Sequence, residues 1–178
     1  DFTSARTPRG DALLGDGSLG WGSLKFSNAD EAVLARVRNH VQVMGMQLVK
    51  YQKYDHGIVG TRGHGNVAMT RLRELSLWGT NSYTKFIPRE AFGWDRQERL
   101  MLLAGLVDTD GTLNDFSTCS PRLARDFADL VRSLGGKATI NPHVTKDQNG
   151  TICNSLRVYF RLNDRMPLAI PRKQAVNC

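Results

Sequence analysis

The sequence has few residues of the kinds that form disulfides or zinc sites. Its 178 residues include three cysteines and four histidines, with no C-x-x-C spacing. Disulfide frameworks and zinc sites need paired or clustered cysteine and histidine ligands, so we expect neither here. An odd number of cysteines indicates free thiols in a reducing compartment. These features predict a cytoplasmic protein.

The sequence also has no long apolar segment. The longest apolar run, at residues 100–107, has eight residues, whereas a helix that spans a membrane needs about 20. We therefore expect no membrane partner. The chain starts at Asp1, without an initiator Met and without the features of a signal peptide. We interpret it as a fragment of a longer chain.

Acidic residues are fewer than basic residues. Lys and Arg total 24, Asp and Glu total 17, and the formal net charge is +7. A surplus of this size favours a polyanionic partner such as nucleic acid, although basic surfaces also occur on proteins that bind no polyanion. The hydrophobic content of 40% is typical of a soluble globular protein with a core.

The most informative feature of the sequence is an internal repeat. ALLGDGSL aligns with LVDTDGTL, so that Asp16 corresponds to Asp110. FSNADEAVLARVRNHVQVMG aligns with FSTCSPRLARDFADLVRSLG, and KFIPRE aligns with LAIPRK. These segments occupy residues 12–19 and 106–113, 26–45 and 116–135, and 85–90 and 168–173. The chain therefore divides into halves at residues 1–93 and 94–178, which we expect to pack as one pseudo-symmetric body.

Each half is predicted to contain a helix, two strands, a second helix, two more strands and further helix. Ser120 suits a helix N-cap and Pro121 the first helical turn. The segments after the helices alternate polar and apolar residues, which is typical of strands with one wet and one buried face. We expect Lys137, Thr139, Asn141, His143 and Thr145 opposite a buried face of Ala138, Ile140, Pro142 and Val144. The prediction is an α+β fold of two α-β-β-α-β-β-α halves with antiparallel sheets.

Residues 108–112, DTDGT, allow two interpretations. In the first, they are a D-x-D-G-T phosphatase signature with Asp108 as the nucleophile and Asp110 as the acid. That chemistry also needs a later pair of acidic residues for magnesium, but the acidic residues after Asp110 are isolated. The first repeat has Leu14 at the position of Asp108. A phosphatase therefore remains a minor alternative.

In the second interpretation, each repeat contributes one aspartate at the end of a helix. Ala104 and Gly105 would let a helix at residues 95–107 approach a second helix closely. Two such helices about a pseudo-twofold axis would bring Asp16 and Asp110 together. Adjacent carboxylates repel each other unless a proton or a cation intervenes, and magnesium suits such hard oxygen ligands. Metal ions shared between carboxylates can activate water and stabilise a leaving oxygen in phosphodiester cleavage.

LAGLVDTDG, residues 103–111, resembles the signature of the LAGLIDADG homing endonucleases at seven of nine positions. LLGDGSL, residues 13–19, is similar to the form found in the endonuclease domains of inteins, and so is K-x-I-P at residues 85–88. The resemblance implies a monomeric, site-specific double-strand DNA endonuclease with a saddle of antiparallel sheets over a long asymmetric site. It also implies two or three Mg²⁺ ions, with Mn²⁺ or Ca²⁺ as substitutes in binding. Such a protein would associate with the nucleoid when bound to DNA.

The resemblance assigns roles to particular residues. Asp16 and Asp110 would be catalytic metal ligands, assisted by the backbone carbonyls of Gly15 and Thr109. Lys85 matches the family's lysine, which acts near the attacking water or the phosphate. The equivalent residue in the second half is Leu168, so Lys173 and Lys137 are candidates to replace the missing lysine.

The first signature helix departs from the family pattern. Asp11 stands where the second copy has Gly105, and Pro8 limits how early the helix begins. We expect a short or altered helix. With Leu168, this departure leaves open a non-cutting relative that binds DNA or RNA, such as a maturase.

The wet faces of the strands suit a major groove, which admits a β-ribbon. Arg157 and Arg161 can read guanine, and Asn141 and Gln47 can read adenine. Lysine and arginine near the first sheet can neutralise phosphates. The full set of candidate DNA-binding residues is Lys25, Gln47, Lys50, Lys53, Arg62, Lys137, Thr139, Asn141, His143, Ser155, Arg157, Tyr159, Arg161 and Lys173.

Overall fold

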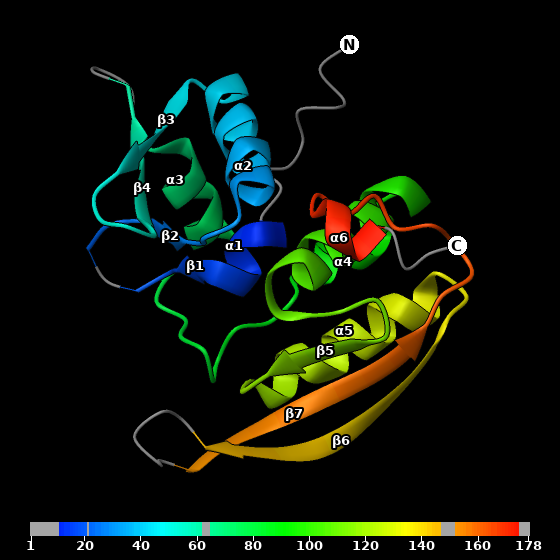
Figure 1. Ribbon diagram of the computed structural model, residues 1–178. Helices are drawn as coiled ribbons and strands as arrows, with labels where there is room; N and C mark the ends of the chain where they lie inside the picture. Colours follow the sequence, from blue (N-terminus) through cyan, green and yellow to red (C-terminus); the bar gives the residue numbers. More distant parts are fainter. Residues whose placement is uncertain (1–10, 21, 62–64, 147–151, 175–178) are drawn as a thin grey trace.

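The computed structural model describes residues 11–20, 22–61, 65–146 and 152–174. Figure 1 shows two lobes, each with a sheet and helices, and between them the two central helices α1 (Asp11–Asp16) and α4 (Arg96–Asp110). The lobes follow the two repeats in the sequence. Within the described residues, no helix has the length and hydropathy needed to cross a bilayer.

The first lobe has the predicted order of elements. It contains α1 (Asp11–Asp16), β1 (Gly17–Ser18), β2 (Lys25–Ser27), α2 (Glu31–Val43), β3 (Met46–Lys50), β4 (Asp55–Gly60) and α3 (Val67–Glu74). A short 3-10 helix, Arg89–Gly93, follows. The four strands form one antiparallel sheet in the order β1-β2-β4-β3. The α-β-β-α-β-β-α order is therefore confirmed in this lobe.

The second lobe differs from the prediction by one strand. It contains α4 (Arg96–Asp110), β5 (Asp115–Thr118), α5 (Pro121–Ser133), β6 (Lys137–Lys146), β7 (Ile152–Arg161) and α6 (Pro171–Gln174). The described strands form a sheet in the order β5-β7-β6. The counterpart of β1 is reduced to one bridge between Gly111 and Phe116. Thr112 N donates to Asp115 O at 2.7 Å, and this tight turn leaves no length for a further strand.

Local sequence explains where the main helices begin. Ser120 caps α5, because its Oγ accepts from Leu123 N at 3.1 Å and Pro121 occupies the first turn, as predicted. Helix α4 begins with a capping box: Asp95 Oδ1 accepts from Glu98 N at 2.8 Å, and Glu98 Oε2 accepts from Asp95 N at 3.2 Å. The N-termini of α4 and α5 are thus fixed by side chains close in sequence.

The core is continuous between the lobes because α4 is buried on nearly all sides. The residues of α4 from Leu102 to Asp108 are all buried, as expected for a helix that is apolar all round. In the second lobe, α5 covers the sheet, and Phe127 stacks on Phe116 with ring centroids 4.2 Å apart. This central position of α4 fixes where its last residue, Asp110, can lie.

The prediction of a buried face along the whole of β6 is wrong. Ala138 and Ile140 are partly buried, but Pro142 is exposed and Val144 is 62% exposed. Helix α5 covers only one end of the β6–β7 hairpin, and the other end extends beyond it (Figure 1). The outer part of the hairpin therefore has two solvent-accessible faces.

Candidate functional site

The site lies where the two central helices end. Helix α1 ends at Asp16 and α4 ends at Asp110, and the two helices pack against each other. A Cβ added at Gly15 would lie 1.8 Å from Thr109 Oγ1 and 3.0 Å from Asp110 Oδ2. Only glycine fits at position 15, so the closest approach of the helices occurs beside the aspartates. The structure thus brings together the two carboxylates that the repeat predicted to meet.

The aspartates lie in a partly desolvated environment, in which Asp16 is half-buried and Asp110 retains solvent exposure. The pKa of Asp110 is raised to about 6, chiefly by burial and also by the charge of Asp16, while Lys85 and Lys173 oppose the shift. Burial also raises the pKa of Asp16, although a hydrogen bond from Asn28 Nδ2 to Asp16 Oδ2 opposes this. Both carboxylates therefore bind protons more readily than free aspartate does. A cation would relieve the same electrostatic cost.

Lys85 is a buried cation beside the aspartates. It is 8% exposed, and its Nζ donates to the carbonyl oxygen of Gly15 in the last turn of α1. Burial lowers the pKa of Lys85, while Asp110 and Asp16 oppose that shift. Its backbone is held by the second lobe, because Ser120 Oγ donates to Lys85 O at 2.6 Å.

Lys173 approaches the same region from the other lobe. Its Nζ donates to the carbonyl oxygens of Val107 at 2.6 Å, Asp108 at 2.9 Å and Gly111 at 2.7 Å, at the C-terminal end of α4. It also acts on the pKa of both Asp16 and Asp110. Lys173 therefore lies at the aspartate site rather than on a sheet face. Lys137, the other candidate replacement for a lysine at Leu168, starts β6 and is exposed.

Asp108 faces away from this site. Its side chain is 3% exposed and binds Arg36 Nη1 at 3.3 Å. Its two oxygens accept from Ala169 N at 2.6 Å and from Ile170 N at 3.2 Å. A phosphatase nucleophile must reach its substrate, so the minor phosphatase interpretation loses its nucleophile. The described residues also contain no cluster of three or more His, Cys, Asp and Glu side chains able to hold a metal.

The proposed metal ligands have the following contacts. Gly15 O accepts from Lys85 Nζ, and Thr109 Oγ1 donates to the carbonyl oxygens of Gly105 at 3.2 Å and Leu106 at 3.0 Å. Within the described residues, α1 spans six residues; Pro8 and the side chain of Asp11, on which the prediction of a short or altered helix rests, lie outside the part of the chain described. Two carboxylates with nearby carbonyl oxygens form a hard-oxygen donor set of the kind that magnesium prefers.

The β6–β7 hairpin places eight predicted DNA-binding residues on one face. Side chains of directly paired antiparallel residues point to the same side, and the predicted residues are paired with one another. The pairs are Lys137 with Arg161, Thr139 with Tyr159, Asn141 with Arg157, and His143 with Ser155. Strand β5 adds Asp115 and Ser117, which pair with Tyr159 and Arg157. The sequence analysis missed both, although Asp115 aligns with Lys25 in the repeat.

In the first sheet only part of the predicted set shares a face. Lys25 pairs with Gly57 and Gln47 pairs with Val59, which puts Lys25 and Gln47 on one side. Lys50 pairs with His56, which also pairs with the buried Phe26. The pairing therefore places Lys50 on the same face of the sheet as Phe26, and not on the face of Lys25 and Gln47. Lys53 lies in the β3–β4 turn, with its Nζ 5.0 Å from the centre of the Tyr54 ring. Arg62 lies outside the described residues.

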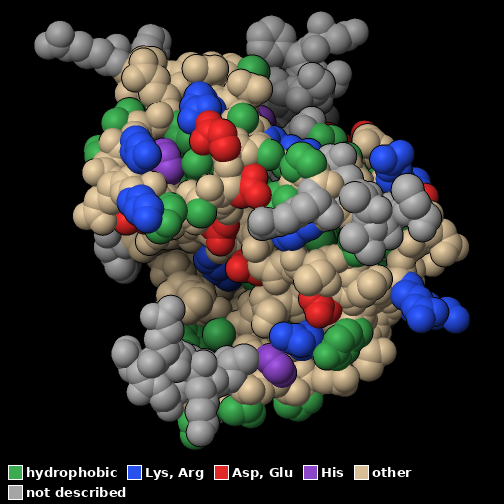
Figure 2. Space-filling view, in the orientation of Figure 1, with side chains coloured by type: hydrophobic (Ala, Val, Ile, Leu, Met, Phe, Trp, Pro, Cys, Tyr) green, Lys and Arg blue, Asp and Glu red, His purple; other side chains and the backbone are tan. Residues whose placement is uncertain are grey.

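The surface between the lobes combines these features. Figure 2 shows the molecule hollowed on the left of the view, between the upper and lower lobes. Acidic and basic side chains lie together at the inner end of this hollow. Asn28, which donates to Asp16, was also missed by the sequence analysis, because its role depends on a contact that only the fold creates.

Comparison with solved structures shows the fold. A structure of mesophilic variants of the homing endonuclease I-DmoI matches with a TM-score of 0.55 and 15% identity, covering 96% of this chain and 95% of that one. I-DmoI in complex with DNA and calcium matches with a TM-score of 0.52 and 12% identity, covering 96% and 97%. The α+β fold of two pseudo-symmetric halves is thus confirmed as the fold of I-DmoI. No family model matches the sequence.

Parts of larger curated proteins are also similar to this chain. A replicative DNA helicase DnaB of Mycobacterium intracellulare is 33% identical over 167 residues, which are 91% of this chain and 24% of the helicase. The DNA-directed RNA polymerase subunit Rpo1C of Methanocaldococcus jannaschii is 31% identical over 103 residues, 57% of this chain and 12% of that subunit. The chain spans about a quarter or less of the length of these relatives.

Proposed function

We propose that this chain is a site-specific double-strand DNA endonuclease of the LAGLIDADG homing type, carried as the endonuclease domain of an intein. The observation that carries the proposal is the pairing of Asp16 and Asp110 at the ends of two touching helices, with Lys85 and Lys173 beside them. Two acidic groups and two basic groups at the junction of two lobes suit a charged, symmetric substrate such as the two strands of DNA.

The chain's own residues supply the elements of phosphodiester hydrolysis. Asp16 and Asp110 would hold divalent cations, which supply Lewis-acid activation of water and neutralise charge on the phosphate. Carbonyl oxygens at Gly15 and Thr109 would complete the ligand set. Lys85 holds a positive charge close to the carboxylates, where it would bind a scissile phosphate or the attacking water. Catalysis would then depend largely on positioning and electrostatic stabilisation.

The sheet faces support DNA as the partner. The β6–β7 face carries Arg157 and Asn141 side by side, which are suited to guanine and adenine edges. I-DmoI was solved in complex with DNA and calcium, and one of its variants in complex with its target DNA in the presence of magnesium. Both lobes belong to one chain, so a monomer would suffice.

The larger relatives support the intein assignment. Segments similar to this chain occur in helicases and in an RNA polymerase subunit, which are proteins of different activity. A segment needed for helicase chemistry would not be expected in an RNA polymerase. A segment that recurs as a minor part of unrelated hosts behaves as an insertion. We therefore propose that the target is the host coding sequence at the point of insertion.

The rival is a protein of the same fold that binds nucleic acid without cutting it. The observation in its favour is the buried Leu168 at the position equivalent to Lys85. A plasmid that joins the two host coding sequences flanking the proposed intein would separate the two functions. With magnesium, we expect linear plasmid from the wild type, and binding without cleavage from Asp110→Asn. The exposed Asp129→Asn is the matched control. Tight binding without cleavage by the wild type, in magnesium and in manganese, would favour the rival.

A further inference from the structure

The repeat places two equivalent loops against the opposite lobes. Residues 85–90 lie against α5, where Ile87 N donates to Asp126 Oδ2 at 3.0 Å. Arg122 also covers the ring of Phe86, with its guanidinium carbon 3.8 Å from the ring centre. The equivalent loop, residues 168–173, directly follows Pro167, whose carbonyl oxygen accepts from Arg36 of α2 in the first lobe. The equivalent segment of each repeat is therefore held by contacts with other parts of the chain. We call the contacts of residues 85–90 with α5 the first fastening, and those of residues 167–173 with Arg36 and Asp108 the second fastening.

The two fastenings differ in charge at one aligned position. Arg36 occupies the place in α2 that Asp126 occupies in α5. An arginine has no acceptor for backbone N–H groups, so the loop at residues 168–173 needs a carboxylate from elsewhere. Asp108 supplies it: its oxygens accept from Ala169 N and Ile170 N.

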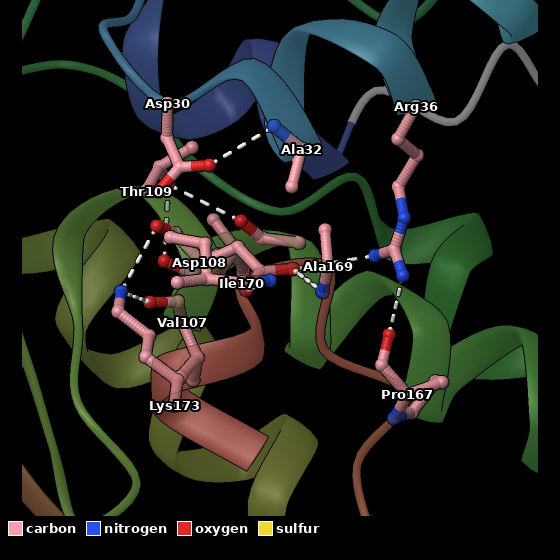
Figure 3. Close-up of polar contacts among 12 residues, drawn as sticks. Asp30, Ala32, Arg36, Val107, Asp108, Thr109, Pro167, Ala169, Ile170 and Lys173 are labelled. Atoms are coloured by element: carbon pink, nitrogen blue, oxygen red, sulfur yellow. Dashed lines mark hydrogen bonds and ion pairs between the residues drawn. The ribbon is translucent and has the colours of Figure 1, made fainter. Parts of the chain in front are cut away.

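Arg36 then completes this second fastening. Its Nη1 binds Asp108 Oδ2 at 3.3 Å, and its Nη2 donates to Pro167 O at 2.6 Å. Figure 3 shows the Arg36 side chain reaching both Asp108 and Pro167. A buried carboxylate is costly unless it is paired, so Asp108 and Arg36 depend on each other. For the equivalent loop of the first repeat, Asp126 of α5 accepts from Ile87 N, and the buried Leu14 stands at the place of Asp108.

This fastening lies immediately before Lys173. Ala169 and Ile170 directly precede the four-residue α6, which begins at Pro171 and carries Lys173. Lys173 aligns with Glu90 of the first half, which pairs with Arg71 instead of facing the aspartates. The two lysines beside the aspartates thus come from non-equivalent positions of the repeat.

We propose that Arg36 and Asp108 are positioning residues that place Lys173 at one of the two cleavage centres, where it does for one DNA strand what Lys85 does for the other. The inference rests on the proposed endonuclease function. Asp108 would not touch DNA or metal. It would act by fixing the backbone of residues 167–170. This segment leads directly into α6, from which the Lys173 side chain extends to the end of α4 (Figure 3).

Strand-resolved cleavage tests the proposal. The joined-flank duplex carries a different fluorophore on each strand, and single-turnover rates are measured for each strand. We expect Lys85→Met and Lys173→Met each to slow one strand about a hundredfold, on opposite strands. Arg36→Met and Asp108→Asn should slow the same strand as Lys173→Met, by about tenfold to a hundredfold. Equal slowing of both strands by the Arg36 and Asp108 variants, or full activity of Lys173→Met, would overturn the proposal.

Amide hydrogen exchange provides a readout that needs neither DNA nor metal. Asp108→Asn should speed exchange at the amides of Ala169 and Ile170 and leave that of Ile87 unchanged. Asp126→Asn should instead speed exchange at the amide of Ile87 and leave the amides of Ala169 and Ile170 unchanged. If the wild type cuts neither strand, the proposed function fails, while exchange still decides whether Asp108 holds the loop. Unchanged exchange at Ala169 and Ile170 in Asp108→Asn would refute the fastening itself.

A double substitution that gives the second fastening the residue types of the first is a further test. Arg36→Asp combined with Asp108→Leu gives the second fastening the residues of the first, with a carboxylate at position 36 and leucine at position 108. We expect the double variant to cut the affected strand faster than Arg36→Asp alone, because position 36 can then accept from the loop amides without a second buried carboxylate. A double variant as slow as Arg36→Asp would contradict the equivalence of the two fastenings.

Discussion

Replacing Asp110 with asparagine should stabilise the metal-free protein at neutral pH. Burial and the charge of Asp16 raise the pKa of Asp110 to about 6, above the usual 3.8 of an aspartate. The folded state therefore binds this proton more tightly than the unfolded chain does. The stabilisation from that proton is fully present below about pH 4 and is lost as the pH rises through about 6. At pH 7.5 the folded protein carries the whole cost of an ionised carboxylate at this site.

The size of the effect follows from the pKa difference. For a fully buried group this pKa difference would correspond to roughly 3 kcal/mol in the free energy of unfolding. Asp110 is exposed to solvent, so screening lowers the expected effect to about 1 kcal/mol. This is an upper limit for Asp110→Asn, because Lys85 and Lys173 lose part of their compensating charge in the variant. For a chain of this length, 1 kcal/mol moves the melting temperature by roughly 2–4 °C.

Urea denaturation in EDTA at pH 7.5 and pH 4 measures the difference between wild type and variant. We expect Asp110→Asn to be the more stable protein at pH 7.5, with the difference shrinking towards zero at pH 4. The exposed Asp129→Asn controls for the chemical change alone. Magnesium should stabilise the wild type and reduce the gap at pH 7.5, because a ligand that binds only the folded state raises its stability. A variant no more stable than wild type at pH 7.5 would refute the electrostatic reasoning.

Three other substitutions test separate parts of the structure. Gly15→Ala should lower both stability and cleavage, because its Cβ would lie 1.8 Å from Thr109 Oγ1, whereas Gly20→Ala meets no atom within 4 Å and should change neither; equal melting temperatures for these two variants would contradict the close helix contact. Ser120→Ala should lower the free energy of unfolding, measured by urea denaturation, by about 2 kcal/mol, since it removes the α5 N-cap and the hydrogen bond to Lys85 O. A loss of only about a few tenths of a kcal/mol would show that neither hydrogen bond contributes to stability. Arg157→Met should relax preference for one base pair of the target by about 1–3 kcal/mol, whereas Lys25→Met should weaken all sequences alike and lower the salt slope by about one; identical effects in a salt titration would argue against separate base and phosphate roles.

The repeat made the central feature predictable from sequence. Asp16 and Asp110 align as the last residues of two copies of one helix, and copies of a fold related by a pseudo-twofold axis bring equivalent points together. The capped start of α5 was predictable for a different reason, since Ser120 and Pro121 act on their own helix. Both inferences use local sequence or symmetry and need no knowledge of long-range contacts.

The features that were missed or wrong depend on contacts between distant segments. Asp108 aligns with Leu14, which made it look dispensable, but its role is visible only once α2 and the loop at residues 168–173 are placed together. Lys50 follows Val49 in a strand without regular alternation, so only pairing with His56 reveals its face. The exposure of Val144 depends on how far α5 extends over the hairpin, which the alternation of residues in β6 does not encode.

The most direct test of the account is to count divalent ions at the paired helix ends. Manganese binding to the protein in complex with the joined-flank duplex can be measured by electron paramagnetic resonance. We expect bound manganese in the wild type, its loss or reduction in both Asp16→Asn and Asp110→Asn, and no change in Asp129→Asn. Full retention of bound manganese after both site substitutions, with DNA still bound, would contradict a shared cation site between Asp16 and Asp110.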